Sequence, residues 1–168
     1  RANSGPNDLI LVFFAGHGVE IDGVPYLLTS DVRRDALEDL ALPMSAISRA
    51  LRGFQGRQVL LLVDACRNDP RQGRGDADAA LTDGLARGLR PMVAGPGTAP
   101  ATVATLLACD VGERAWEMPE ENHGAFTYFL LQGLDGAAAD AQGDVGVGSL
   151  ARYVTGAVKD WGARARRP

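Results

Sequence analysis

Three apolar segments that do not alternate with polar residues constrain the fold more than any other feature of this sequence. They are residues 8–14 (DLILVFF), 58–63 (QVLLLV) and 102–109 (TVATLLAC), and each contains β-branched residues. Strands with one solvent-exposed face alternate apolar and polar residues, whereas strands of a parallel sheet are buried on both faces and form continuous apolar segments. The pattern therefore predicts three buried strands in one mostly parallel sheet.

Helices are expected where apolar residues recur every three to four positions. The three stripes are Met44, Ile47, Leu51 and Phe54; Phe126, Phe129, Leu130 and Leu134; and Leu150, Tyr153, Val154, Ala157, Val158 and Trp161. Pro43 suits the first turn of the first helix, and Ser149 is the expected N-cap of the third. Helices that alternate with buried strands predict an α/β sandwich.

Composition excludes several classes of protein. At 168 residues, 46% hydrophobic and 23% charged, the chain fits one globular domain over residues 1–168. With 17 basic against 21 acidic residues, it is not expected to bind nucleic acid or an anionic membrane surface. Its two cysteines form no CxxC or Cys/His metal spacing, so we expect no disulfide framework and a reducing, cytoplasmic location.

The segment 67–100 differs from the rest of the chain. It is rich in Gly and Pro, has little apolar periodicity, and contains five arginines but no lysine. A stretch of this length without periodic structure is typical of a functional loop or of a solvated linker. Both interpretations stay open from composition alone.

Chemically useful residues follow the first two apolar segments. His17 lies between two glycines after the first, and Cys66 follows the second. Because the carboxyl ends of parallel strands meet at one edge of a sheet, we expect these residues to face each other across neighbouring strands. A thiol beside an imidazole is an activated nucleophile, and the Gly18 N–H is expected to help hold an oxyanion.

Each of these residues also has an ordinary structural interpretation. A lone Cys after a strand is commonly a small buried apolar residue, and a His between glycines is commonly a turn residue. Their joint placement favours catalysis. Cys109 ends the third segment without a His–Gly pair beside it, and His123, which precedes a helix, stays the alternative base for Cys66.

The segments 13–18 (FFAGHG) and 61–68 (LLVDACRN) resemble caspase-like cysteine peptidases, in particular metacaspases and bacterial orthocaspases. Weaker similarities extend over nearly the whole chain, at residues 26–31, 87–91, 112–117 and 124–127. The resemblance implies a caspase-like three-layer α/β sandwich with a mostly parallel central sheet, whose first strands are not seen before Asp8. It also implies that His17 is the catalytic histidine and Cys66 the nucleophile, with the Gly18 and Cys66 amides as oxyanion hole.

Asp64 separates this chain from animal caspases, which carry Gln two residues before the catalytic cysteine. An acid there resembles the metacaspases, in which it forms part of an S1 pocket for a basic side chain. The resemblance thus implies a cysteine endopeptidase that cleaves after Arg, less readily after Lys, and not after Asp. The alternative is a structural acid that caps the turn.

The resemblance also gives the 67–100 segment a function as a mobile processing loop. A peptidase specific for basic residues is expected to cut itself there, and the candidate positions are Arg71, Arg74, Arg87 and Arg90. The chemistry requires no cofactor. Calcium is a candidate ligand of Asp31, Glu38 and Asp39, for which an exposed acidic helix start is the alternative.

The partners expected from the resemblance are protein or peptide substrates, together with an upstream part of the same protein or a regulatory domain. A second hypothesis is a caspase-like regulatory or scaffolding module with an inactive or incomplete cleft. The unseen first strands favour it, and the presence of both His17 and Cys66 opposes it. Amidotransferase chemistry fits poorly because its triad needs a His after the Cys.

Overall fold

The computed structural model describes residues 8–22, 24–52, 54, 58–66, 102–108 and 115–165. The chain divides into two compact units, Arg1–Arg114 and Ala115–Pro168.

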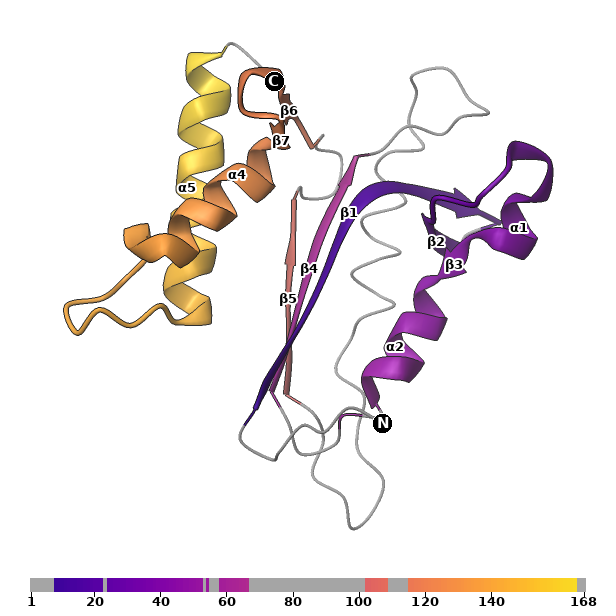
Figure 1. Cartoon of the computed structure of the whole chain (residues 1–168), viewed down its shortest axis with the longest axis horizontal. Coiled ribbons are helices and arrows are strands. Elements are labelled where there is room, and N and C mark those ends of the chain that lie inside the picture. Colours follow the sequence, from indigo (N-terminus) through magenta and orange to yellow (C-terminus); the bar gives the residue numbers. More distant parts are fainter. Residues whose placement is uncertain are drawn as a thin grey trace. The chain divides into compact units, whose positions relative to one another are not determined.

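A five-stranded sheet in the order β3-β2-β1-β4-β5 forms the centre of the first unit (Figure 1). Its strands are β1 (Leu9–Ile21), β2 (Val24–Leu28), β3 (Leu42–Pro43), β4 (Gln58–Cys66) and β5 (Thr102–Leu107). β4 is parallel to both β1 and β5, whereas β2 is antiparallel to β1 and β3. The three apolar segments thus form a parallel centre as predicted, and the α/β fold class is confirmed. The antiparallel extension through β2 and β3 was not predicted.

β1 is longer than the sequence pattern indicates. It pairs with β4 from Leu9 to His17 and with β2 from His17 to Ile21. His17 therefore lies within the strand, neither after it, as the apolar segment indicates, nor in a turn, which was its ordinary structural interpretation. The chain reverses later, at Asp22, whose φ of 50° lies in the left-handed region that Asp tolerates. β2 then returns alongside the end of β1, so the glycines lie in extended strand.

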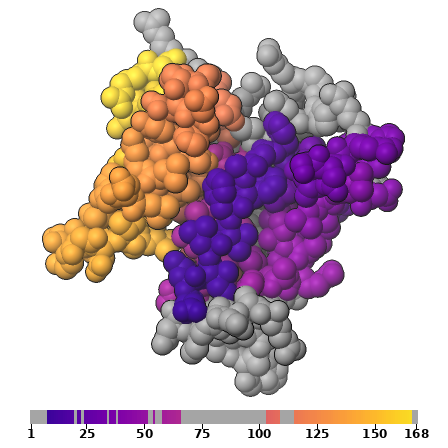
Figure 2. Space-filling view, viewed as in Figure 1, coloured from indigo at the N-terminus to yellow at the C-terminus, as the bar shows by residue number. Residues whose placement is uncertain are grey.

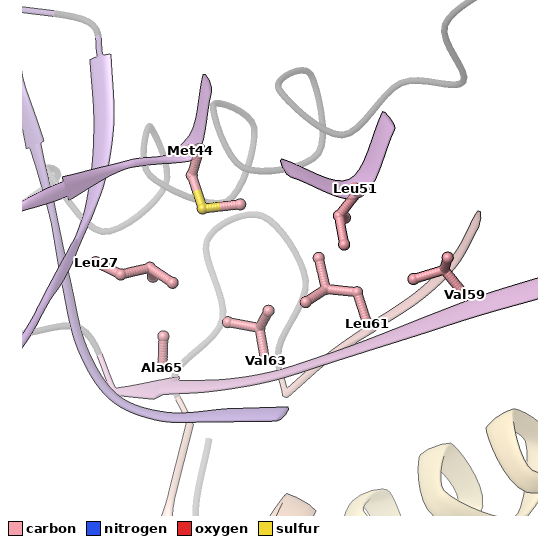
Figure 3. Packing of buried hydrophobic residues seen from close by; sticks show 7 residues of the cluster. All are labelled: Leu27, Met44, Leu51, Val59, Leu61, Val63 and Ala65. Carbon is pink, nitrogen blue, oxygen red and sulfur yellow. The ribbon is translucent and has the colours of Figure 1, made fainter. Parts of the chain in front are cut away.

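One face of the sheet is covered by α2 (Met44–Arg52), as the first apolar stripe predicts (Figure 1). The helix begins directly after Pro43, which lies in β3. The buried cluster comprises Leu27, Met44, Leu51, Val59, Leu61, Val63 and Ala65 (Figure 3). Four of these are alternate residues of β4, so the odd-numbered side chains of β4 face α2. The short helices η1 (Arg34–Ala36) and α1 (Leu37–Leu40) connect β2 to β3.

The opposite face of β1 lies at the surface. Ile10, Val12 and Phe14 pack against the core cluster beneath α2. The alternate side chains of Leu9, Leu11 and Phe13 are 45–54% exposed, and the indigo atoms of β1 reach the surface in Figure 2. Strand alternation therefore assigns even-numbered residues of β1 to the α2 core, up to Gly16, and odd-numbered residues, His17 included, to the other face.

The second unit is a short hairpin followed by two packed helices. The hairpin comprises β6 (Glu117–Met118), η2 (Pro119–Glu121) and β7 (His123–Gly124). The helical part comprises α4 (Ala125–Gln132), the π-helical turn η3 (Gly133–Ala137) and α5 (Val147–Arg164). Phe126, Leu130, Leu150 and Val154 are buried, which confirms the two remaining helices. Within the described ranges, no helix combines the length and the apolar character needed to span a membrane.

Two local expectations in this unit are wrong. Leu134 is 44% exposed because it lies in η3, where the wider π-helical turn ends the regular spacing. Ser149 is not the N-cap, since α5 begins at Val147 after the extended Gly146, three residues earlier than predicted. Its hydroxyl instead donates a hydrogen bond to the Gly146 carbonyl at 2.9 Å.

Packing between α4 and α5 depends on the absence of a side chain at Gly133. A Cβ there would lie 2.6 Å from Leu150 Cδ1 and 3.1 Å from Tyr153 Cδ1, although the backbone is helical (φ −61°, ψ −43°). Gly156 in α5 is the matched control, because a Cβ there would meet nothing within 4 Å. We expect Gly133→Ala to lower the free energy of unfolding by about 1–3 kcal/mol through overpacking. Gly156→Ala should raise it by about 0.5–1 kcal/mol through helix propensity.

Thermal and urea unfolding of both variants measure this difference. Equal changes in the two variants would contradict the close approach of α4 and α5 at Gly133.

Candidate active site

His17 and Cys66 lie opposite each other on neighbouring parallel strands. The register of β1 against β4 pairs the two residues at the α-carbon level, and Cys66 is the last residue of β4. Neighbouring strands are about 4.8 Å apart, so the two backbones are separated by about one strand spacing. The structure thus places the two residues together, as their positions after the apolar segments predicted. It describes the backbone of Cys66, and the thiol itself lies outside the described part.

The backbone of His17 is held from both sides. It is paired with Cys66 on β4 and with Leu28 on β2, so His17 occupies the position where the two ladders meet. Its side chain is exposed, on the face of the sheet opposite α2. A side chain on a strand that pairs with a neighbouring strand on each side is positioned more accurately than a side chain on a loop. The support from β2 was missed because a glycine-flanked His reads as a turn, although the segment 24–28 has the apolar character of a strand.

Asp64 is a buried carboxylate on the same face as His17. It is 5% exposed and pairs with Ala15 of β1, two positions before the His17–Cys66 pair. Its neighbours Val63 and Ala65 belong to the α2-facing core, so alternation directs the Asp64 side chain to the other face. Asp64 has an interaction partner, which a buried carboxylate requires. The site therefore combines an exposed imidazole with a buried carboxyl group.

Gly18, the predicted oxyanion-hole residue, lies one residue beyond His17. It is buried inside β1 and pairs with Leu27 of β2. Its amide belongs to a strand rather than to the turn that the sequence suggested. The function of that amide, like that of the Cys66 amide, stays a prediction.

The candidate calcium ligands lie between β2 and β3. The Asp31 carboxylate accepts a hydrogen bond of 2.5 Å from the Thr29 hydroxyl, and this bond, with a backbone hydrogen bond, holds the pKa of Asp31 below its usual range. Asp39 is exposed, and the side chain of Glu38 lies outside the described part. Among the side chains that the structure describes, no three His, Cys, Asp or Glu residues are grouped so that they could hold a metal ion.

The remaining candidates lie outside the described residues or in the second unit. The 67–100 segment lies outside the described residues, and with it the four predicted processing positions Arg71, Arg74, Arg87 and Arg90. Cys109 lies outside them as well. His123, the alternative base, is exposed in β7 of the second unit, where it pairs with Met118.

Comparison with known families identifies the chain. The family model for the caspase domain matches residues 1–167, a range that includes both compact units. The chain therefore belongs to the caspase-domain family of cysteine peptidases, as the two sequence segments around His17 and Cys66 indicated. No curated protein matches it, and no solved structure matches it.

Proposed function

We propose that this caspase-domain chain is an active cysteine endopeptidase that cleaves after Arg, and less readily after Lys, through a dyad of Cys66 and His17. The observation that carries the proposal is the register of β1 against β4, which pairs these two residues on neighbouring strands. Membership of the family supplies the class of substrate, which is protein or peptide. A reducing cytoplasmic location would keep the thiol in its reactive form.

The reaction proceeds through two acyl-transfer steps. The Cys66 thiolate attacks the scissile carbonyl carbon, and the carbonyl oxygen becomes an oxyanion that accepts hydrogen bonds from the Gly18 and Cys66 amides. The imidazolium of His17 protonates the leaving amine as the C–N bond breaks, which leaves a thioester on Cys66. His17 then removes a proton from water, which attacks the thioester, and the acid product departs as the thiolate is regenerated.

Asp64 is proposed to select a basic P1 side chain. Its support is position: it is buried, lies on the His17 face of the sheet, and precedes Cys66 by two residues in β4. A carboxylate shielded from water makes a strong charge-assisted contact with a cation. The planar guanidinium of Arg makes two parallel hydrogen bonds to a carboxylate, which the compact ammonium of Lys does not, and this favours Arg over Lys.

Two further proposals extend this activity. Self-cleavage at Arg71, Arg74, Arg87 or Arg90 follows from a preference for Arg, because these residues share a Gly- and Pro-rich segment directly after the nucleophile. Calcium binding through Asp31, Glu38 and Asp39 would regulate the enzyme from outside the dyad, because these residues lie between β2 and β3. Neither proposal changes the chemistry at Cys66.

The activity is tested with two fluorogenic peptides that differ only in carrying Arg or Asp at P1. We expect the Arg peptide alone to be cleaved, and Cys66→Ala to reduce kcat/KM by more than about 10³-fold. Cys109→Ala is the matched control and should cleave as the wild type does. Cleavage of the Asp peptide would contradict the proposed pocket, and no cleavage of either peptide would favour the regulatory module.

The pocket is tested separately with Asp64→Asn, which keeps the size of the side chain and removes its charge. We expect kcat/KM for the Arg peptide to fall by about 30-fold or more, because a buried charge pair loses one partner. Alkylation of Cys66 by iodoacetamide should keep its wild-type rate, since the dyad is intact. An unchanged kcat/KM in a variant with wild-type thermal stability would assign Asp64 a structural function only.

A further inference from the structure

The aromatic ring of Phe14 occupies the place that a side chain at Gly16 would need. A Cβ built on Gly16 would lie 2.9 Å from Phe14 Cζ and 3.3 Å from Cε1. The two residues are two positions apart on β1 and therefore share the α2-facing side of the strand. The ring thus lies directly over the backbone of the residue before His17.

Gly16 is required here for space rather than for backbone freedom. Among the described glycines, only Gly136 and Gly143 have a positive φ, so the backbone of Gly16 is accessible to any residue. The close approach of the Phe14 ring is what excludes a side chain. This glycine and this aromatic ring therefore form one structural unit.

The position of the ring is set by the hydrophobic core. Phe14 packs against the cluster beneath α2, and its backbone pairs with Val63, which belongs to that cluster. Close-packed cores do not let an aromatic ring shift without loss of contacts. A substitution of Phe14 is therefore expected to displace the backbone of Gly16, and a side chain at Gly16 is expected to displace the Phe14 ring.

Gly16 adjoins the dyad directly. It pairs with Ala65, one position before the pairing of His17 with Cys66. A displacement of the Gly16 backbone moves the His17 α-carbon, since one peptide unit joins them. A misplacement of about 1 Å in a reacting group can cost about 10²-fold in rate.

We propose that Phe14 is a positioning residue for His17: its core-packed ring, seated on Gly16, sets the position from which β1 presents the imidazole opposite Cys66. The expected loss of activity rests on the proposed function, whereas the expected displacement of His17 does not. Phe13 provides a matched control, because it precedes Phe14 on the same strand, is 45% exposed and lies on the opposite face.

The test follows the His17 imidazole by NMR and the Arg-peptide activity in the same variants. The chain contains two histidines, so the His17 and His123 Cε1–Hε1 signals are assigned with one His123→Gln variant. At fixed pH we expect Gly16→Ala to shift the His17 signal, leave the His123 signal unchanged, and lower kcat by about tenfold or more with little change in KM. Adding Phe14→Leu to Gly16→Ala makes room for the methyl group and should restore both readouts most of the way.

Phe14→Leu alone should shift the His17 signal as well, and Phe13→Leu should not. The comparison of Phe14→Leu with Phe13→Leu tests the proposal even when Gly16→Ala does not fold. An unmoved His17 signal in Gly16→Ala and in Phe14→Leu would overturn it, as would a double variant no better than the single Gly16→Ala. A wild type that cleaves no peptide refutes the proposed function, and the His17 signals still decide the positional statement.

Discussion

The parallel ladder between β1 and β4 is the constraint on which the rest of the first unit depends. It runs from Leu9 opposite Gln58 to His17 opposite Cys66 without interruption. Because side chains alternate along a strand, a slip of one residue would exchange the two faces of β1, so that Phe13 would replace Phe14 in the closely packed α2 core, and it would move His17 away from Cys66. Packing beneath α2 therefore favours this register, and the register brings together the two residues of the proposed dyad.

β4 shows how one strand serves both purposes. Its odd-numbered residues, among them Val59 and Leu61, fill the core beneath α2. On its other face, next to equally buried leucines, it carries the carboxylate of Asp64. Burial of a carboxylate is costly unless partners compensate, so such a group does little for stability as compared with an apolar residue of similar size. The proposed recognition of a cationic side chain would give an acid at this point a function that packing does not.

Much of this arrangement is predictable from the sequence because it depends on simple periodicity. Unalternated apolar segments predict the parallel centre, and the placement of His17 and Cys66 after two such segments predicts that they meet. The pairing of β2 with β1 is not predictable in the same way, because glycines beside His17 are equally compatible with a turn and with an extended strand. The contact of Phe14 with Gly16 is not predictable either, because it depends on the rotamer of a ring within a packed core. The start of α5 lies three residues before the predicted one, because Gly and Ser both serve as N-caps and the sequence does not decide between Gly146 and Ser149.

The most direct test of the account is whether a thiol at position 17 can be bridged to Cys66. We would treat His17→Cys, in a Cys109→Ser background, with dibromobimane, a reagent that becomes fluorescent only after it joins two neighbouring thiols. Phe13→Cys is the control, since it lies on the same face of β1 but pairs with Leu62, four residues before Cys66. The account predicts strong fluorescence from His17→Cys and little from Phe13→Cys, with peptide mapping that joins positions 17 and 66. Equal fluorescence from the two variants, or none from His17→Cys, would contradict the register that creates the site.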